Sequence, residues 1–296
     1  MPASQAWRLE FEIPHMRFDA GTTFNVAGHQ LSLAPVDASK SKGYLRFTLD
    51  SDVVDAQKAK RLGIGWLQRN LIDTYMVVYG RDLRPRFSDP VLLNRSELGP
   101  SLRTINDRID FTVHLLGLIT FGDVEKSLSV ARRLRQDANG KALQRSLRWF
   151  RKASDSTEAV DEFVTLWVAF NAFYGTFDPN RRGDKTAIGN LINAYPSTDK
   201  IREILTADDV AVAALVSRGL TDWRRRANYS EQLNVSLGGQ DARTTLRKVC
   251  ICLLSVRNEI FHGGVKPTKD TAFLRKCAGL LRRIYRECYC AYLGLT

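Results

Sequence analysis

The chain lacks any long apolar segment, and no run approaches the roughly 18 consecutive apolar residues that a membrane-spanning helix needs. Its first residues, MPASQAWRLEFEIPH, contain no apolar signal core and carry charges early, so we expect a cytoplasmic protein with no membrane partner. Internal repeats and low-complexity tracts are also missing. With 296 residues, 44% of them hydrophobic, the sequence is instead suited to one large or two modest globular domains.

Cysteine is scarce, and the five cysteines all lie in the last 47 positions: Cys250, Cys252, Cys277, Cys288 and Cys290. No C-x2-C pair occurs, and C-x-C on a helix directs its two thiols apart, which argues against zinc. The size and expected compartment of the protein argue against a disulfide framework. We therefore predict buried, reduced thiols.

Other signatures of cofactor chemistry are missing too. The histidines outside the last helices, His15, His29 and His114, are far apart and show no metal-ligand spacing. The segment GTFDPNRRGDK combines glycine with basic residues but lacks the spacing of a phosphate-binding P-loop. We predict neither a metal site nor a cofactor.

Positive charge is abundant and unevenly distributed. The net charge is +12, and residues 140–296 hold 25 Lys and Arg against 16 Asp and Glu. This balance favours an anionic partner such as nucleic acid, and the basic character belongs mainly to the C-terminal half.

The texture of the sequence changes near residue 120. Apolar and polar residues alternate in 7–13, 29–35, 43–50 and 108–116, which predicts strands, and a helix is expected over 52–79. Residues 1–120 are therefore interpreted as a small α+β domain of unknown role. Residues 121–139 are expected to form a connecting helix, and 140–296 an all-helical domain.

Within the helical half, a helix is expected to begin at Ser156 or Thr157 and to end at Gly175. Shorter helices are expected near 186–194, 198–205 and 208–219. Two stronger ones, about 242–262 and 268–293, follow.

The stretch SVRNEIFHGG, residues 255–264, carries the clearest chemical signal. Upstream apolar residues recur at helical spacing and predict one buried stripe: Val249, Cys252, Leu253, Val256 and Ile260. Arg257, Asn258 and His262 are expected to project from the opposite side, with Gly263 ending the helix.

These three residue types suit phosphate chemistry. Arginine can donate two hydrogen bonds to a phosphate, asparagine can position a partner, and histidine can exchange protons near neutral pH. RNA supplies its own nucleophile, the 2′-OH, so that a metal is not obligatory. The alternative is an ordinary solvated helix end.

The segment Arg257-Asn258-Glu259-Ile260-Phe261-His262-Gly263 resembles the R-x4-6-H signature of HEPN domains. A second block, residues 142–175, is similar to the first two helices of the Apea-like HEPN group, with fitting residues at Trp149, Phe163, Trp167, Ala169 and Tyr174. The resemblance covers residues 140–296. It implies an all-helical bundle, a homodimer with a composite cleft, and a metal-independent endoribonuclease that leaves 2′,3′-cyclic phosphate and 5′-hydroxyl ends.

By that resemblance, His262 moves protons, Arg257 holds the phosphate and Asn258 orients one of them. HEPN members often carry a glutamate where this chain has Asn171. Asn171 is either a polar residue bonded inside the bundle or a residue of the same cleft. The implied setting is prokaryotic antiviral defence or toxin-type growth arrest, with an antitoxin or another protein regulator as a partner.

Further basic groups are candidates for RNA contact. Trp223, Arg224, Arg225 and Arg226 combine an aromatic ring with a dense positive patch. Two more groups recur at helical spacing, namely Arg145, Arg148 and Lys152, and Arg282, Arg283 and Arg286. For each, the alternative is a solvated helix face whose arginine stems cover apolar surface.

Two other functions remain open from the sequence. The helical domain could be a non-catalytic RNA-binding or assembly module, or the N-terminal domain could be a sensor while the helical half only dimerises. Toxicity on expression separates both of these functions from the nuclease, because an active nuclease slows growth and an adaptor does not.

Overall fold

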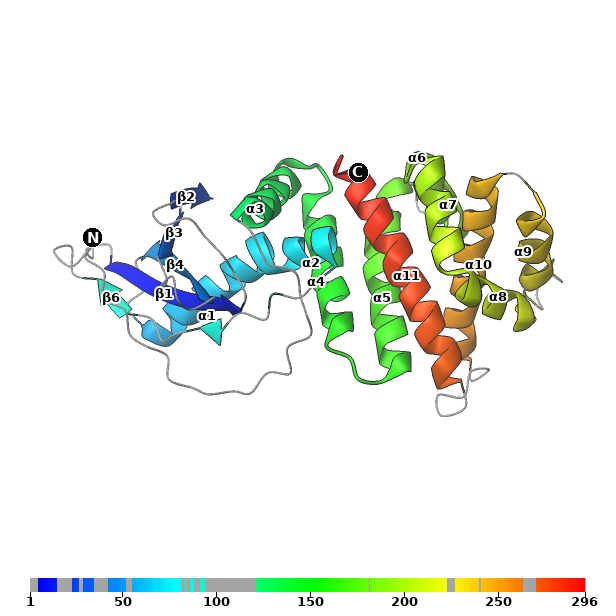
Figure 1. Ribbon diagram of the computed structural model, residues 1–296, viewed down its shortest axis with the longest axis horizontal. Coiled ribbons are helices and arrows are strands. Elements are labelled where there is room, and N and C mark those ends of the chain that lie inside the picture. Colours follow the sequence, from blue (N-terminus) through cyan, green and yellow to red (C-terminus); the bar gives the residue numbers. More distant parts are fainter. Residues whose placement is uncertain are drawn as a thin grey trace. The chain divides into compact units, whose positions relative to one another are not determined.

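The computed structural model describes the following residues: 5–14, 23–26, 29–34, 42–51, 55–80, 83, 86–87, 91–93, 121–180, 182–222, 227–239, 241–262 and 270–295. The chain divides into two compact units, Met1–Arg133 and Leu134–Thr296. The described residues are mostly helical (Figure 1). No described helix combines the length and apolarity needed to cross a lipid bilayer.

The described strands of the first unit form one antiparallel sheet. Its long central pair is β1 (Gln5–Pro14) and β4 (Lys42–Ser51), matched along their whole lengths. Trp7 and Leu9 are both buried and lie two residues apart, so one face of β1 is covered. The order is β2–β3–β4–β1–β5, and β6 also pairs with β1. The remaining strands are β2 (Thr23–Val26), β3 (His29–Ala34), β5 (Arg86–Phe87) and β6 (Val91–Leu93).

A continuous helical segment follows β4. Its parts are α1 (Ala56–Leu67), a π-helical turn (Gln68–Ile72) and α2 (Asp73–Tyr79). Asp55 begins it by accepting a hydrogen bond from the Lys58 N–H at 2.7 Å, and Gly80, with φ of 69°, ends it in the left-handed region. Residues 94–120, including the strand expected at 108–116, lie outside the described residues, so the α+β interpretation of residues 1–120 stays a prediction.

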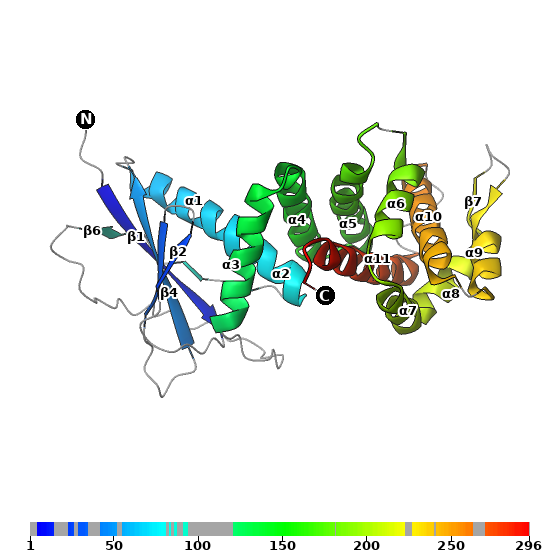
Figure 2. The ribbon, with the colours of Figure 1, turned by 90° about the horizontal axis from the view of Figure 1, so that it is seen from above.

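Helix α3 (Phe121–Gln136) crosses the division between the units. The second unit is built from helices, with one short β-pair between α8 and α9 (Figures 1 and 2). Its elements are α4 (Gly140–Ser154), α5 (Ala159–Tyr174), a 3₁₀ turn (Gly175–Phe177), α6 (Asp184–Ala194), α7 (Thr198–Ala207), α8 (Asp209–Ser217), β7 (Thr221–Asp222), β8 (Ala227–Asn228), α9 (Tyr229–Leu237), α10 (Ala242–Phe261) and α11 (Thr271–Tyr292).

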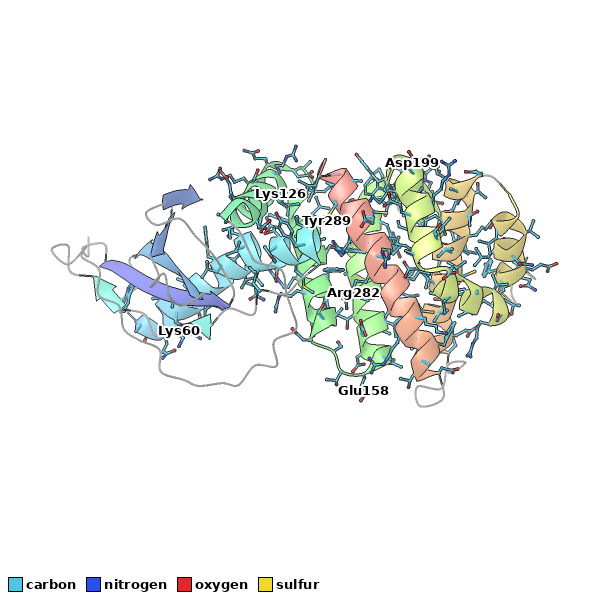
Figure 3. The ribbon with its side chains drawn as sticks, in the orientation of Figure 1. Lys60, Lys126, Glu158, Asp199, Arg282 and Tyr289 are labelled. Carbon is cyan, nitrogen blue, oxygen red and sulfur yellow. The ribbon has the colours of Figure 1, made fainter. Side chains whose placement is uncertain are left out.

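Helices α4, α5 and α11 share a core that is rich in aromatic rings. The rings of Phe150 and Tyr285 stack with centroids 4.5 Å apart. The hydroxyls of Ser146 and Tyr285 share a hydrogen bond at 2.7 Å, and Tyr289, marked on α11 in Figure 3, donates to the Leu143 carbonyl at 3.1 Å. These polar groups are satisfied where they are buried, so the three helices have one defined register.

Helix α10 is the central helix of the second unit. It contacts α5, α6, α7, α8, α9 and α11, and every residue from Val249 to Val256 is buried. Figure 2 shows it between α6 and α9. The expectation of a single apolar stripe is therefore wrong: Cys250, Ile251 and Ser255, off the predicted stripe, are covered by neighbouring helices as well.

Two other expectations need correction. Helix α5 does not begin at Ser156 or Thr157, because its N-cap is Glu158, whose side chain makes no capping bond. Helix α9, which the sequence pattern did not predict, begins at Asn228, whose side chain accepts from the Glu231 N–H at 3.0 Å.

Candidate functional site

Helix α10 brings the three motif residues to its C-terminal end. The N–H of His262 donates to the Asn258 carbonyl at 3.0 Å, which makes His262 the C-cap of the helix. Asn258 and His262 are exposed. The imidazole makes no hydrogen bond to any described residue, so within one chain nothing in the described part fixes its orientation.

Arg257 and Asn258 are directly linked. The Arg257 Nη1 donates to the Asn258 Oδ1 at 2.9 Å, and the guanidinium carbon lies 5.2 Å from the centroid of the Phe261 ring. Phe261 itself is 62% exposed. The amide and the ring hold the guanidinium from its own helix, and other donors of the same guanidinium are left for an anionic ligand.

Arg257 is half-buried, at the edge of the core and not on a fully solvated face. It lies close enough to Tyr174, at the end of α5, for its charge to lower the pKa of that phenol. The net pKa of Tyr174 is nevertheless well above its ordinary value. The main cause is burial, and the carboxylate of Asp184, in the first turn of α6, adds to it.

Tyr174 and its neighbour Trp167 carry polar atoms that the described residues do not satisfy. Both side chains are at most 2% exposed, and their ring centroids are 6.1 Å apart. Neither Tyr174 Oη nor Trp167 Nε1 has a hydrogen-bond partner among the described residues. Asp184 and Trp167 therefore act on the Tyr174 hydroxyl through proximity, without hydrogen-bonding geometry. This group of side chains, from α5, α6 and α10, adjoins the start of the motif.

Asn171 lies on the face of α5 that carries this group. The positions of Trp167, Asn171 and Tyr174 are spaced i, i+4, i+7, which places them along one side of a helix. The Asn171 side chain is half-buried and makes no hydrogen bond to a described residue. Of the two expectations for Asn171, membership of the same cleft fits this placement better, and it stays a prediction.

A cluster of ion pairs lies beside the C-terminal end of α10. Arg218, which follows α8, lies with its Nη1 2.7 Å from the Asp270 carboxylate and its Nε 3.8 Å from that of Glu259. Glu259 belongs to the motif segment, and Asp270 is the N-cap of α11. Burial raises the pKa of Glu259; Arg218 opposes that shift and Asp270 adds to it. Arg218 therefore ties the end of α10 to the start of α11.

The other basic groups expected at an RNA surface divide into three cases. Trp223, Arg224, Arg225 and Arg226 lie outside the described residues. Arg145, Arg148 and Lys152 are exposed on α4, as an RNA contact requires, and their role stays a prediction.

Arg282 and Arg283 have partners inside the protein, which favours a structural role for both, and their role as RNA contacts stays a prediction. The Arg282 Nη2 donates to Glu162 at 2.8 Å and its Nη1 donates to the Ser154 hydroxyl at 2.6 Å, while the Arg283 Nε lies 2.5 Å from Asp208. Figure 3 marks Arg282 in this position on α11. These pairs tie α11 to α4, α5 and the α7–α8 corner.

The prediction that the cysteines are buried is confirmed. All five are free and buried. Burial raises the pKa of Cys252 and of Cys277 to about 12, and raises those of Cys250 and Cys288 further, so these thiols stay protonated. Among the described residues, no group of three or more His, Cys, Asp or Glu side chains could hold a metal ion.

The comparisons with known proteins add no assignment. No protein-family model matches the chain, and neither the curated proteins nor the solved structures give a match.

Sequence reasoning missed two groups of residues. One is the pair of charged residues, Arg257 and Asp184, that act on the pKa of Tyr174, and the other is a pocket lined in part by Lys185 and Arg247. Both join residues that are 60 or more positions apart, and no spacing rule within a single helix could have found them.

Proposed function

We propose that the protein is a metal-independent endoribonuclease of the HEPN type, with Arg257, Asn258 and His262 as its working residues. The observation that carries the proposal is their convergence at the end of α10, where Asn258 holds the Arg257 guanidinium at 2.9 Å and His262 is exposed one turn further on. The helical second unit agrees with the architecture that the resemblance implies.

The chemistry needs only these groups and the substrate. The 2′-oxygen of RNA attacks the adjacent phosphorus, and its proton passes to the His262 imidazole. The bond between phosphorus and the 5′-oxygen breaks, and the departing oxygen takes up a proton. The products are a 2′,3′-cyclic phosphate and a 5′-hydroxyl. Arg257 stabilises the charge on the phosphate oxygens, and Asn258 fixes the direction of Arg257.

The active form is a homodimer in which two α10 ends face each other across a composite cleft. Two observations support this arrangement. Phe261 exposes a large apolar side chain directly beside Arg257, and His262 lacks an orienting partner among the described residues of its own chain. A second copy of the chain would cover the exposed Phe261 side chain and would orient the His262 imidazole. Cellular RNA as substrate, a cytoplasmic location, a role in antiviral defence or growth arrest, and a protein regulator belong to the same proposal.

A non-catalytic RNA-binding or assembly module is the second candidate, and the exposed, unoriented imidazole of His262 is the observation that favours it. Incubation of the purified full chain with total RNA, in excess EDTA, separates the two. We expect cleavage to persist in EDTA, to leave cyclic-phosphate ends and to fail on DNA of the same sequence. No cleavage by a properly folded dimer, or cleavage that requires added magnesium, would overturn the endoribonuclease proposal.

A further inference from the structure

Helix α4 carries a row of cations on the face that points away from the core. At 3.6 residues per turn its exposed basic residues fall within an arc of about 60°. They are Lys141, Arg145, Arg148 and Lys152, and these four residues form the α4 row. The buried residues of the helix, among them Leu143, Leu147 and Phe150, centre on the opposite side. Helix α4 therefore packs by one face and presents a basic face to the solvent.

The α4 row has no counter-charge in the described part of the chain. None of its four side chains forms an ion pair with a described residue, and α4 itself contains no acidic residue. The carboxylates at the two ends of the helix are engaged elsewhere. Asp137 accepts a hydrogen bond from the Tyr292 hydroxyl, and Asp155 pairs with Arg151 at 3.6 Å. The row therefore keeps its positive charge for an external partner.

The α4 row is unfavourable for the stability of its own helix. Like charges three or four positions apart on a helix repel each other. The row contains three such pairs in succession: Lys141–Arg145, Arg145–Arg148 and Arg148–Lys152. Lys141 also lies in the first turn, where the positive end of the helix dipole disfavours a cation. Folding alone therefore does not account for the row.

The shape of the row favours a polynucleotide over a membrane surface. Lys141 and Lys152 are 11 positions apart, so the row is straight and about 16 Å long at 1.5 Å of rise per residue. A nucleic-acid strand in a duplex presents a phosphate about every 3.4 Å along the axis, so several phosphates fit along that length. A helix that binds in a membrane surface inserts an apolar face, and the apolar face of α4 is buried in the bundle.

Trp149 adds a feature that is typical of single-strand binding. Its side chain is half-buried beside the row, and the Lys152 Nζ lies 4.9 Å from the centroid of its ring. Proteins that hold single strands combine a basic track for the backbone with aromatic rings on which bases stack. The row and the ring together therefore fit a single strand better than an acidic protein surface.

We propose that the α4 row binds the phosphate backbone of single-stranded RNA at a place separate from the cleavage site. The motif residues lie at the C-terminal end of α10, and α5 stands between α4 and α10 (Figures 1 and 2). The choice of RNA rests on the proposed endoribonuclease function, whereas the contact with phosphate does not. Arg145 and Arg148 make the central contacts, because they lie in the middle of the row.

Fluorescence anisotropy of the full chain tests the proposal. The probe is a labelled single-stranded 2′-O-methyl oligoribonucleotide, which lacks the free 2′-OH and is not cleaved. The double variant Arg145→Gln/Arg148→Gln should weaken binding about tenfold at about 100 mM salt. The slope of log affinity against log salt should become shallower by about 1.4, since each phosphate contact on a single strand contributes about 0.7. The melting temperature should hold or rise, because all three like-charge pairs lose a charge.

The matched control is Arg202→Gln/Lys276→Gln. It removes the same charge from exposed positions on α7 and α11. Affinity should change by less than about twofold, because charges farther than about 10 Å from the strand are screened at this salt concentration. A second variant, Arg145→Lys/Arg148→Lys, keeps the charge and should keep most of the binding, since lysine still contacts phosphate as a point charge.

Three results would overturn the proposal. One is equal affinity and salt slope in the parent and the glutamine variant, and another is a loss in the lysine variant as large as that in the glutamine variant. The third is row-dependent binding to vesicles of phosphatidylcholine and phosphatidylserine without row-dependent binding of the RNA probe.

Cleavage of unmodified RNA, measured beside these titrations, separates this inference from the proposed function. Parental cleavage without row-dependent binding refutes the α4 row alone. Row-dependent binding without cleavage refutes the endoribonuclease alone.

Discussion

Arg218 meets Asp270 in a two-point contact, with Nη1 2.7 Å from Oδ1 and Nη2 3.4 Å from Oδ2. The same guanidinium lies 5.1 Å from the Phe273 ring centroid and pairs with Glu259 at 3.8 Å. One side chain from the end of α8 thus connects the end of α10 with the start of α11, immediately beside Asn258.

Arg218→Ala should destabilise the protein by about 1–3 kcal/mol, because it leaves two partly buried carboxylates without their cation. Amide hydrogen exchange at the end of α10 should accelerate more than at its middle. Arg202→Ala is the control, since Arg202 pairs with Asp199 on the exposed surface and its loss should cost at most about 0.5 kcal/mol. Equal effects of the two substitutions would contradict the bridging role of Arg218.

Glu259 should make stability depend on pH in a defined direction. Its pKa in the folded protein is raised, so between its ordinary and raised values the native state holds more protons than the unfolded chain. The free energy of unfolding therefore falls as the pH rises through that window, and the loss persists at neutral pH. Glu259→Gln should raise the melting temperature at pH 7 relative to the parent by more than it does at pH 4. A larger loss at pH 7 would mean that the pair with Arg218 outweighs the burial.

His262→Ala should reduce RNA cleavage by about 10²–10⁴-fold, the range that general acid–base catalysis contributes. Because the imidazole is exposed and makes no hydrogen bond to a described residue, the melting temperature should not change. Cleavage rate, RNA affinity and melting temperature are measured together. A near-parental cleavage rate would remove the main support for the nuclease.

Arg257→Lys should retain RNA binding but keep only part of the parental cleavage rate, since lysine keeps the charge and loses the bidentate fork. Arg257→Ala should abolish cleavage and also lower the melting temperature modestly. The cause is the loss of its hydrogen bond to Asn258 and of its contact with the Phe261 ring.

Two buried tyrosines should respond oppositely to the loss of their hydroxyls. Tyr289→Phe removes the hydrogen bond to the Leu143 carbonyl and should cost about 0.5–1.5 kcal/mol. Tyr174→Phe removes a hydroxyl that no described residue satisfies, so it should be neutral or stabilising. Denaturant unfolding of both variants makes the comparison. A loss at Tyr174 as large as that at Tyr289 would show that its hydroxyl has a structural partner.

The sequence predicted the helices well where the apolar residues lie on one face of the helix. In α4, the buried residues Leu143, Ser146, Leu147 and Phe150 follow helical spacing, and the boundaries of α10 and α11 fall within three residues of those expected. The sequence did not predict that α10 is buried on every side. Small residues such as Cys250 and Ser255 stand between the larger apolar residues, so the pattern suggested one apolar stripe.

The surroundings of the motif required the tertiary fold. The sequence singled out Arg257, Asn258 and His262 because they lie on one helix end. Arg257 and Asp184 both act on the pKa of Tyr174 only because α5 and α6 pack against α10. The pairing of Arg282 with Glu162 likewise joins residues 120 positions apart, and a list of cations cannot tell a paired arginine from a free one.

Helix α11 is the last helix to be synthesised, and it packs against helices that are made much earlier. It supplies Tyr285, Tyr289 and Arg282 to partners on α4 and α5, more than a hundred residues earlier in the chain. A ribosome adding residues one by one therefore produces α4 and α5 well before α11, the helix that packs against them, and completes the motif segment shortly before α11 begins. The bundle cannot close until about residue 292 has been made, so a nascent chain carries the whole motif while its scaffold is still open. For the endoribonuclease proposed above, this order of synthesis would delay the onset of activity until the chain is almost complete.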